Sequence, residues 1–323
     1  MTVGEVAPFQ LRIGVTLGDP RGIGPEVAAA AVRMFRAATN HRLIFIGPAG
    51  TDADAAADEI IHSGSWHTGG DATLAGHLAG TAIEIGARLA LDGDIDALVT
   101  APIDKAALNA GGFHFPGHTE MLAAFAGVDD VVMLMAAERT VLGGPLRVVL
   151  ATTHIPLSEV PRAFTVERLV SQARITADAL QSGWRLERPR VALCAFNPHA
   201  SDGGLFGQEE ARIYVPALAE LRRHGLDVAG PIPADTVFLR AARGEFDVVI
   251  APYHDVGMAA FKTAAFGSGV NVTLGLPFPR TSPDHGTALD RVGRGGADAS
   301  SMFEALTLAA RLAARRASSA PVA

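Results

Sequence analysis

The stretch "VVIAPYHDVGMAAFK", residues 248–262, joins an apolar run to a histidine, an aspartate and a lysine. The run at 248–251 has the length and composition of a buried strand, yet ionisable groups follow it directly. Two other segments repeat this layout, "VVLATTHIPL" with His154 and "VALCAFNPHA" with His199. Side chains that follow neighbouring parallel strands gather at one edge of the sheet, so His154, His199 and His254 predict a shared site.

The rest of the chain alternates short β-rich runs with longer amphipathic segments. Strands are predicted at 11–17, 43–46, 97–100, 131–135, 146–152, 191–196, 248–251 and 270–274. Helices are predicted at 25–38, 72–91, 119–125, 166–181, 208–223 and 300–315. This alternation is typical of an α/β protein with a largely parallel sheet covered by helices. Gly143 and Gly144, between two apolar runs, predict a local hairpin.

Composition narrows the class of protein. A chain of 323 residues with 49% hydrophobic and 19% charged residues is long enough for one large or two medium globular domains. The net charge of −7 gives no reason to expect nucleic acid as a partner. The first residues lack the pattern of a secretory signal, and no apolar stretch approaches the ~20 residues of a membrane span. We therefore expect a cytoplasmic protein with no membrane partner, whose tail at 315–323 frays.

The three histidines suit a divalent metal. Neutral imidazoles favour Zn²⁺ or Co²⁺ over Ca²⁺ and leave a coordination position for water or substrate. Their spacing matches no local metal motif, and a single histidine in such a place is more often a hydrogen-bonded structural residue. Because all three histidines follow a strand in the same way, a metal site is favoured over three separate structural histidines.

Two helix starts carry further candidate residues. "GDPRGIGPE", residues 18–26, combines turn-forming glycines with Pro25 in a first helical turn, and a helix N-terminus there could hold an anion. Its glycine spacing is not that of a Rossmann site, and a plain structural turn is the alternative. "PGHTE", residues 116–120, places His118 beside Thr119, which is a candidate N-cap.

Two later segments suggest ligand contacts. Lys262 and Arg280 with Asn271 between them could clamp a phosphate or carboxylate, whereas either cation alone would be read as a surface charge. "DHGTALDRVGRGGAD", residues 284–298, is either a long loop or a ligand-contacting loop. In the second interpretation Asp290 and backbone N–H groups meet ribose and adenine. The glycine- and proline-rich stretches 111–118 and 266–283 are predicted joints between lobes.

Taken together these segments, with "LVTAPIDKAAL", "NPHASDGGLFGQEE" and "GVNVTLGLPFPRTSPDHGTA", resemble the 4-hydroxythreonine-4-phosphate dehydrogenase family of pyridoxal phosphate biosynthesis. The resemblance spans nearly the whole chain. It extends to the isocitrate and isopropylmalate dehydrogenases, whose motifs look like residues 18–26 and 285–295. It implies a two-lobed α/β/α fold that is not a Rossmann dinucleotide fold. Residues 1–118 with 275–323 would form the nucleotide-side lobe, and 119–274 the metal, substrate and dimerisation lobe.

The resemblance also assigns roles to single residues. It implies one divalent metal, Zn, Co or Mg, on His154, His199 and His254. It implies substrate and phosphate contacts from His118, Thr119, Lys262, Asn271 and Arg280. NAD, with NADP left open, is expected at His285, Gly286, Thr287 and Asp290. Family members are homodimers with the metal site at the subunit interface, where one histidine comes from the partner. Asp235, Asp255 and Lys105 are open candidates for proton transfer, or for orienting a metal-bound histidine.

The expected reaction is oxidation of the 3-hydroxyl of 4-phosphooxy-L-threonine by NAD. The product, 2-amino-3-oxo-4-phosphooxybutanoate, would lose CO₂ to give 3-amino-2-oxopropyl phosphate. Arg21 stands where the family usually has a small residue, "PIDK" replaces the commoner "PINK", and residues 48–72 are shorter than usual. These departures leave open a paralogue that oxidises phosphorylated threonate or erythronate, or a cyclic dihydrodiol.

Two rival functions come from other classes of protein. A three-histidine zinc hydrolase would account for the histidines but not for residues 284–298. A non-catalytic phosphometabolite sensor would need the phosphate clamp without the metal.

Overall fold

The computed structural model describes residues 10–51 and 53–317, and the chain divides into two compact units. The first unit is Met1–Pro116 with His285–Ala323, and the second is Gly117–Asp284. The end of the tail that was expected to fray, residues 318–323, lies outside the described residues. Within the described chain, no helix combines the length and apolar character that a membrane span requires.

The sheet of the first unit is parallel, with strand order β3-β2-β1-β4. Its strands are β1 Arg12–Thr16, β2 Arg42–Ala49, β3 Glu59–Ser65 and β4 Ala97–Thr100. Strand β3 was not predicted from the sequence. It lies at the edge of the sheet and its residues are only half-buried or exposed, so it shows neither an apolar run nor a clear alternation.

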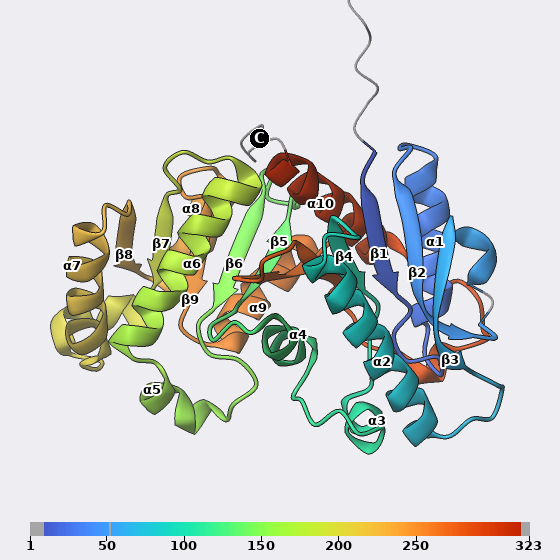
Figure 1. Ribbon diagram of the computed structural model, residues 1–323. Helices are drawn as coiled ribbons and strands as arrows, with labels where there is room; N and C mark the ends of the chain where they lie inside the picture. The colour runs from blue at the N-terminus through green and yellow to red at the C-terminus, as the bar shows by residue number, and fades with distance from the viewer. Residues whose placement is uncertain (1–9, 52, 318–323) are drawn as a thin grey trace, which may run out of the picture. The chain divides into compact units, whose positions relative to one another are not determined.

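Helices cover both faces of this sheet (Figure 1). They are α1 Gly24–Arg36, α2 Ala72–Leu91, α3 Lys105–Ala110 and α10 Ser300–Ala317, with short turns at Asp54–Ala56 and Leu289–Arg291. Helix α2 packs closely on one face, where a Cβ added at Gly86 would meet Leu98 and Thr16. Helices α1 and α10 contact each other on the opposite face. Right-handed crossovers explain this arrangement, because the β1–α1–β2 and β3–α2–β4 connections run in opposite directions along the sheet.

The second unit has the strand order β11-β10-β5-β6-β9-β7-β8. Its strands are β5 Val132–Ala137, β6 Leu146–Leu150, β7 Val191–Cys194, β8 Val228–Ile232, β9 Val248–Ala251, β10 Val270–Leu274 and β11 Arg280–Pro283. The pairs β6–β9, β9–β7 and β7–β8 are parallel, whereas β11, β10, β5 and β6 pair antiparallel. The predicted hairpin at Gly143 and Gly144 is confirmed as the β5–β6 connection, and the α/β class with a largely parallel sheet is confirmed.

Antiparallel pairing of β11 with β10 moves one predicted boundary. The chain passes from the second unit to the first after Asp284, not after residue 274 as the sequence suggested. Residues 280–283 hydrogen-bond to β10, which holds the intervening loop in the second unit. The other division falls after Pro116, inside the predicted joint at 111–118.

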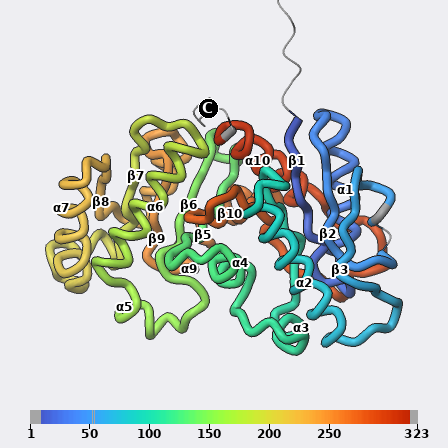
Figure 2. The backbone as a smooth tube through the Cα atoms, viewed as in Figure 1, coloured from blue at the N-terminus to red at the C-terminus, as the bar shows by residue number. Residues whose placement is uncertain are grey.

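The helices of the second unit also lie on both faces of its sheet, as Figure 2 shows. They are α4 His118–Ala126, α5 Val160–Ala163, α6 Val166–Trp184, α7 Val215–Arg223, α8 Ala234–Ala242 and α9 His254–Ala265, with short helical turns at Leu157–Glu159, Pro198–Gly204 and Glu210–Tyr214. A core that includes Val148, Val249 and Phe261 fills the space between the sheet and helices α8 and α9.

Helices α8 and α9 were not predicted from the sequence. Helix α9 begins directly after β9 and contains Gly257, which weakens a helical pattern. In the structure Gly257 is buried, and a Cβ there would meet Leu150 at 2.5 Å. The glycine thus allows α9 to lie close against the sheet.

Candidate functional site

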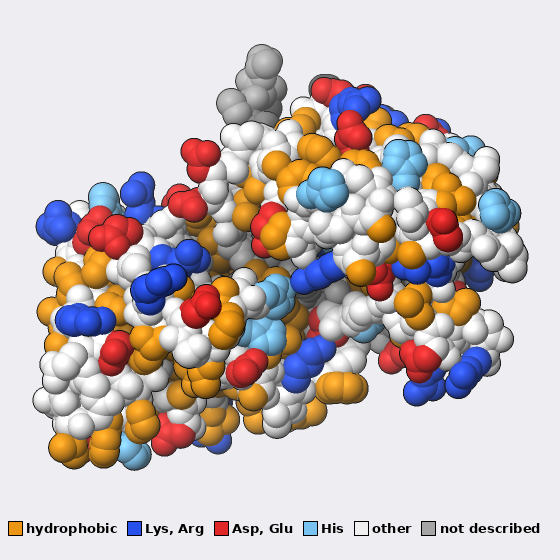
Figure 3. Space-filling view, turned by 90° about the horizontal axis from the view of Figure 1, so that it is seen from below, with side chains coloured by type: hydrophobic (Ala, Val, Ile, Leu, Met, Phe, Trp, Pro, Cys, Tyr) orange, Lys and Arg blue, Asp and Glu red, His pale blue; other side chains and the backbone are white. Residues whose placement is uncertain are grey.

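The three histidines follow three neighbouring parallel strands of the second unit. Strand β9 pairs with β6 on one side and with β7 on the other, so the carboxyl ends of all three meet at one edge. His154 comes after β6, His199 after β7, and His254 opens α9 after β9. The rings of His154 and His254 lie 5.6 Å apart between centroids. Figure 3 shows histidine side chains lying side by side on the surface of the molecule.

A hollow of about 160 Å³ surrounds these two rings, and Tyr253 and Asp255 also line it. Its floor is held by bonds between the strand ends. The Thr152 hydroxyl donates to the carbonyl of Pro252 at 2.9 Å, and the backbone N–H of Ala151 donates to Ala251 at the same distance. These bonds set the positions from which the two imidazoles project.

The imidazole of His254 is oriented by its neighbour. Its Nδ1 lies 2.7 Å from Oδ1 of Asp255, and a carboxylate can only accept, so Nδ1 donates. That tautomer leaves the lone pair on Nε2. Metal-binding histidines are commonly held in this way, with the other ring nitrogen donating to a carboxylate or carbonyl. Of the two roles left open for Asp255, this contact supports the orienting one.

His199 does not join the other two histidines. Among residues 10–51 and 53–317, the structure brings together no group of three or more His, Cys, Asp or Glu side chains that could hold a metal. His199 lies in the turn Pro198–Gly204 and does not line the hollow. One chain therefore assembles two of the three predicted ligands, and His199 as the third ligand stays a prediction.

A row of polar side chains lies along β10 and β11. Thr273 faces Arg280 across the two strands, and Asn271 faces Ser282 one step along, on the same side of the sheet. Arg280 is 2% exposed, and its guanidinium donates to the Thr273 hydroxyl at 2.9 Å. Burial lowers the pKa of Arg280 to about 10, although the charge of Glu120 opposes that shift. A buried guanidinium of this kind favours an anion beside it.

Lys262 lies at the other end of this row. Its Nζ is 2.7 Å from Oδ2 of Asp284, directly after β11, and donates to the Asp284 carbonyl at 3.1 Å. The Oδ1 of Asn271, between the two cations, is buried without a hydrogen-bond partner among the described residues. The structure thus places Lys262, Asn271 and Arg280 along one row, and their role as a phosphate or carboxylate clamp stays a prediction. Asp284 was missed as a partner because β11 was not predicted.

His118 and Thr119 begin α4 in the same unit. The expectation that Thr119 caps this helix is wrong, since Gly117 is the N-cap and no side chain makes the capping bond. Thr119 lies one residue inside the helix, so its hydroxyl is not committed to capping.

The four predicted cofactor residues lie in the first unit, next to the glycine-rich turn. The carbonyl of Thr287 accepts from the backbone N–H of Ile23 at 2.9 Å, and a Cβ at Gly22 would meet this carbonyl at 2.7 Å. His285 and Thr287 are half-buried, whereas Gly286 and Asp290 are exposed. The segment expected to hold an anion and the segment expected to contact the cofactor are thus in direct contact at the start of α1.

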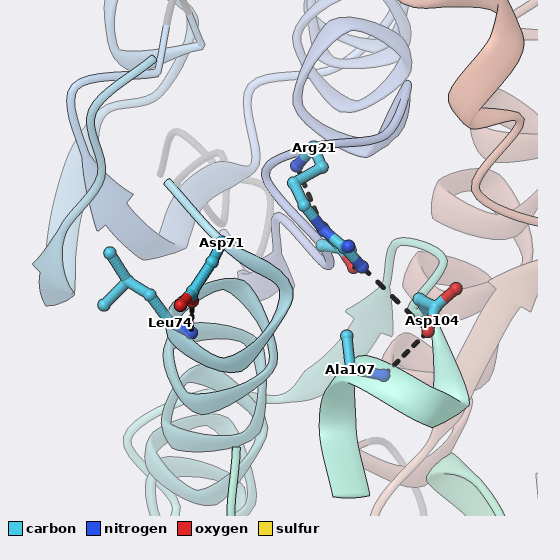
Figure 4. A network of polar contacts seen from close by, with 6 residues as sticks. Arg21, Asp71, Leu74, Asp104 and Ala107 are labelled. Carbon is cyan, nitrogen blue, oxygen red and sulfur yellow. Dashed lines mark hydrogen bonds and ion pairs between the residues drawn. The ribbon is translucent and has the colours of Figure 1, made fainter. Parts of the chain in front are cut away.

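Arg21 in the glycine-rich turn lies among carboxylates (Figure 4). Its Nε and Nη2 donate to both oxygens of Asp19 at 3.1 and 2.7 Å, and Nη2 lies 3.9 Å from Asp104. The hydrogen bond to Asp19 raises the pKa of Arg21, and the charges of Asp104 and Asp71 act in the same direction. Asp104 also caps α3 by accepting from the N–H of Ala107 at 2.7 Å. The two single-residue departures from the family pattern, Arg21 and Asp104, therefore lie side by side.

We expect Arg21→Ala to lower the free energy of unfolding by about 1–3 kcal/mol. Asp19 is 1% exposed and would keep the backbone N–H of residue 21 but lose two charged donors. Urea unfolding at neutral pH would measure the loss, and Arg33→Ala, at an exposed position of α1, serves as the control. A loss no larger than that of the control would show that water replaces the guanidinium.

The other two candidates for proton transfer are exposed and lie in different units. Lys105 is the first residue of α3 in the first unit, and Asp235 lies in the first turn of α8 in the second. Within the second unit, Asp235 does not line the hollow around the histidine pair.

The fold is that of the isocitrate dehydrogenase class. The chain superposes on isocitrate dehydrogenase from Methylococcus capsulatus with a TM-score of 0.52 at 14% identity, over 95% of this chain and 87% of that one, which speaks for the fold alone. Within this class the chain belongs to the PdxA family, because residues 16–309 match the family described as pyridoxal phosphate biosynthetic protein PdxA. The family and fold expected from the motifs are confirmed, and with them an oxidoreductase.

Individual relatives cover almost the entire chain. The chain is 44% identical to 4-hydroxythreonine-4-phosphate dehydrogenase of Paracoccus denitrificans, over 94% of this chain and 98% of that protein. It is 40% identical to a Bradyrhizobium diazoefficiens protein named for D-threonate 4-phosphate dehydrogenase activity, over 94% and 96%. The crystal structure of 4-hydroxythreonine-4-phosphate dehydrogenase from Klebsiella pneumoniae matches with a TM-score of 0.84 at 34% identity, over 94% of this chain and 100% of that one.

Proposed function

We propose that the protein oxidises 4-phosphooxy-L-threonine to 2-amino-3-oxo-4-phosphooxybutanoate with NAD and a divalent metal. The product then loses CO₂ to give 3-amino-2-oxopropyl phosphate. Membership of the PdxA family carries this proposal. The polar row along β10 and β11 supports it, because buried Arg280 with Lys262 suits a doubly charged phosphate.

The residues present fit a divalent metal. His154 and His254 project into one hollow, and the Asp255 contact leaves Nε2 of His254 able to bind a cation. Zn²⁺, Co²⁺ or Mg²⁺ bound there would supply Lewis-acid chemistry for the hydroxyl and for the ketone that it becomes. The chain's own part is to hold the substrate phosphate at Arg280 and Lys262, so that the reacting carbon lies at the histidines. Lys105 and Asp235 remain the candidates for proton transfer.

The third ligand, His199, would come from a second copy of the chain in a homodimer. His199 is followed by exposed apolar side chains, Leu205 at 72% and Phe206 at 47% exposure, and Leu157 beside the hollow is 67% exposed. Such side chains next to an incomplete site favour a protein partner. A two-fold interface would place each His199 turn against the partner's hollow and complete both sites at once.

NAD would bind on the first unit, where His285, Gly286, Thr287 and Asp290 meet the turn before α1. Backbone N–H groups at the start of α1 suit a pyrophosphate, since no side chain caps this helix. Arg21 is an unsuitable ligand for the pyrophosphate because Asp19 already holds its guanidinium. NADP is the alternative cofactor. The proposed location of the protein is the cytoplasm.

A second candidate substrate is D-threonate 4-phosphate, which the relative of 40% identity favours. It shares the phosphate and the hydroxyl but has a hydroxyl in place of the amino group. The clamp at Arg280 and Lys262 would bind both substrates equally, so discrimination has to come from elsewhere.

Side-by-side assays test the proposed function. Purified protein with Zn²⁺ or Co²⁺ and NAD should produce NADH, read by its absorbance, fastest with 4-phosphooxy-L-threonine among phosphorylated threonine, threonate and erythronate. A chelator should abolish the signal, and added metal should restore it. NADH formation only with a threonate or erythronate phosphate would identify the paralogue. The absence of NADH with every substrate would favour the hydrolase or sensor alternatives.

A further inference from the structure

The backbone around His199 has an unusual conformation. His199, Ala200, Ser201 and Asp202 have φ values of 52°, 54°, 67° and 44°, so four consecutive residues with side chains adopt the left-handed region. L-residues disfavour this region, because Cβ crowds the following carbonyl oxygen. Such a run persists only when its surroundings hold it in place.

Glu210 makes several of the hydrogen bonds that stabilise the chain next to this run. Its side chain is 6% exposed, and Oε1 accepts from the backbone N–H of Phe196 at 3.0 Å and of Asn197 at 2.7 Å. Its Oε2 accepts from the side-chain amide of Asn197 at 2.8 Å. A single buried carboxylate thus binds three donors directly before Pro198 and His199.

The helical turn that carries Glu210 contacts the same segment a second time. Glu210–Tyr214 is a π-helical turn, a form that often occurs at functional sites. From its other end the buried Tyr214 hydroxyl donates to the carbonyl of Cys194 at 2.7 Å. The segment 194–197, between β7 and the left-handed turn, is therefore held at both ends by one element.

We propose that Glu210 is a positioning residue for His199. It holds the end of β7 so that the left-handed turn presents this imidazole at a fixed place for the metal. This role rests on the proposed function, in which His199 is a metal ligand. Glu210 has no contact with the hollow that His154 and His254 line, so it acts through the backbone and not as a ligand.

The neighbouring Glu209 offers a matched control. Its Oε2 accepts from the same Asn197 amide at 2.8 Å, and this bond lowers the pKa of Glu209. Unlike Glu210 it is half-buried and does not bind the backbone of residues 196 and 197. The same change, Glu→Gln, therefore removes one acidic group and alters one partner of the Asn197 amide at either position, but only at 210 does it alter the group that accepts from the backbone N–H of Phe196 and Asn197.

The test compares Glu210→Gln with Glu209→Gln in the full-length protein. The first readout is amide hydrogen exchange of residues 196–204 without metal, and the second is Co²⁺ affinity from the visible absorbance of the bound ion. We expect Glu210→Gln to speed exchange at least about tenfold and to weaken Co²⁺ binding by about 10–100-fold. Glu209→Gln should stay within a few-fold of wild type in both.

If Glu210→Gln folds poorly, a second variant provides the test. In this reversed pair, the carboxylate and the amide are exchanged between residues 197 and 210. Glu210→Gln is combined with Asn197→Asp in the background of Glu209→Gln, because Oε2 of Glu209 lies 2.8 Å from the Asn197 amide nitrogen and would repel a carboxylate there. The new amide at 210 then donates to the new carboxylate, while its oxygen still accepts from the backbone. The amide exchange rate of residues 196–204 and the Co²⁺ affinity should then return most of the way to their wild-type values. Equal behaviour of the 210 and 209 variants, or no recovery in the reversed pair, would overturn the positioning role. Failure of the metal site itself would appear separately, as Co²⁺ affinity unchanged in His154→Ala and His254→Ala.

Discussion

Mixing inactive His199→Ala subunits with inactive His254→Ala subunits is expected to restore about one quarter of wild-type activity. Random exchange in equal amounts makes about half of the dimers mixed. Each mixed dimer has one site with His154 and His254 from one subunit and His199 from the other, while its second site lacks two ligands. NADH production after demonstrated subunit exchange measures the recovery.

The structure also names the matched control. His154 and His254 lie 5.6 Å apart on one chain, so mixing His154→Ala with His254→Ala cannot rebuild a site. Activity in that mixture should stay near zero, although the sequence alone would allow any two of the three histidines to complement each other. Recovery in the control, or none in the first mixture, would contradict a site shared in this way. The metal content of each single variant should fall. This measurement tests whether the histidines bind metal independently of whether the site is shared between subunits.

Arg280→Ala is expected to reduce kcat/KM for phosphorylated substrate by about ten- to a hundredfold, since a charge-assisted contact contributes about 1.5–3 kcal/mol. The reduction should be small for the unphosphorylated analogue. Arg280 is 2% exposed and is the most deeply buried cation of the polar row, so solvent cannot readily replace it as the partner of the phosphate. Initial rates with both substrates give the comparison.

Thr273→Val supplies the control for Arg280. It removes the hydroxyl that Arg280 donates to at 2.9 Å but keeps the charge and nearly the same shape. If the charge binds phosphate, Thr273→Val should retain most of the activity that Arg280→Ala loses. Equal losses for phosphorylated and unphosphorylated substrate in Arg280→Ala would mean that the side chain supports the fold instead.

Local patterns in the sequence were sufficient where the physics is local. The apolar runs before His154, His199 and His254 identified three buried strands, and their shared layout placed all three histidines at one edge of a sheet. Gly143 and Gly144 located the β5–β6 hairpin because turn chemistry depends on adjacent residues. The family could also be named from motifs, since these preserve residue type and spacing.

Contacts between distant segments could not be predicted in this way. The strands β3 and β11 and the helices α8 and α9 have weak local patterns and are stabilised by neighbours far along the chain. The ion pair of Lys262 with Asp284 exists because β11 pairs with β10, and Arg21 meets Asp104 because two loops end at the same edge of the first unit.

The sequence by itself determined the family, the α/β class and the set of residues that could bind metal and phosphate. Only the tertiary structure decided how that set divides. It brought His154 and His254 together, left His199 on a left-handed turn, and placed Glu210 behind that turn. Residue type and spacing record what a side chain can bind. The distance between two side chains depends on how the strands that carry them pair, and that pairing is decided by burial over the whole sheet.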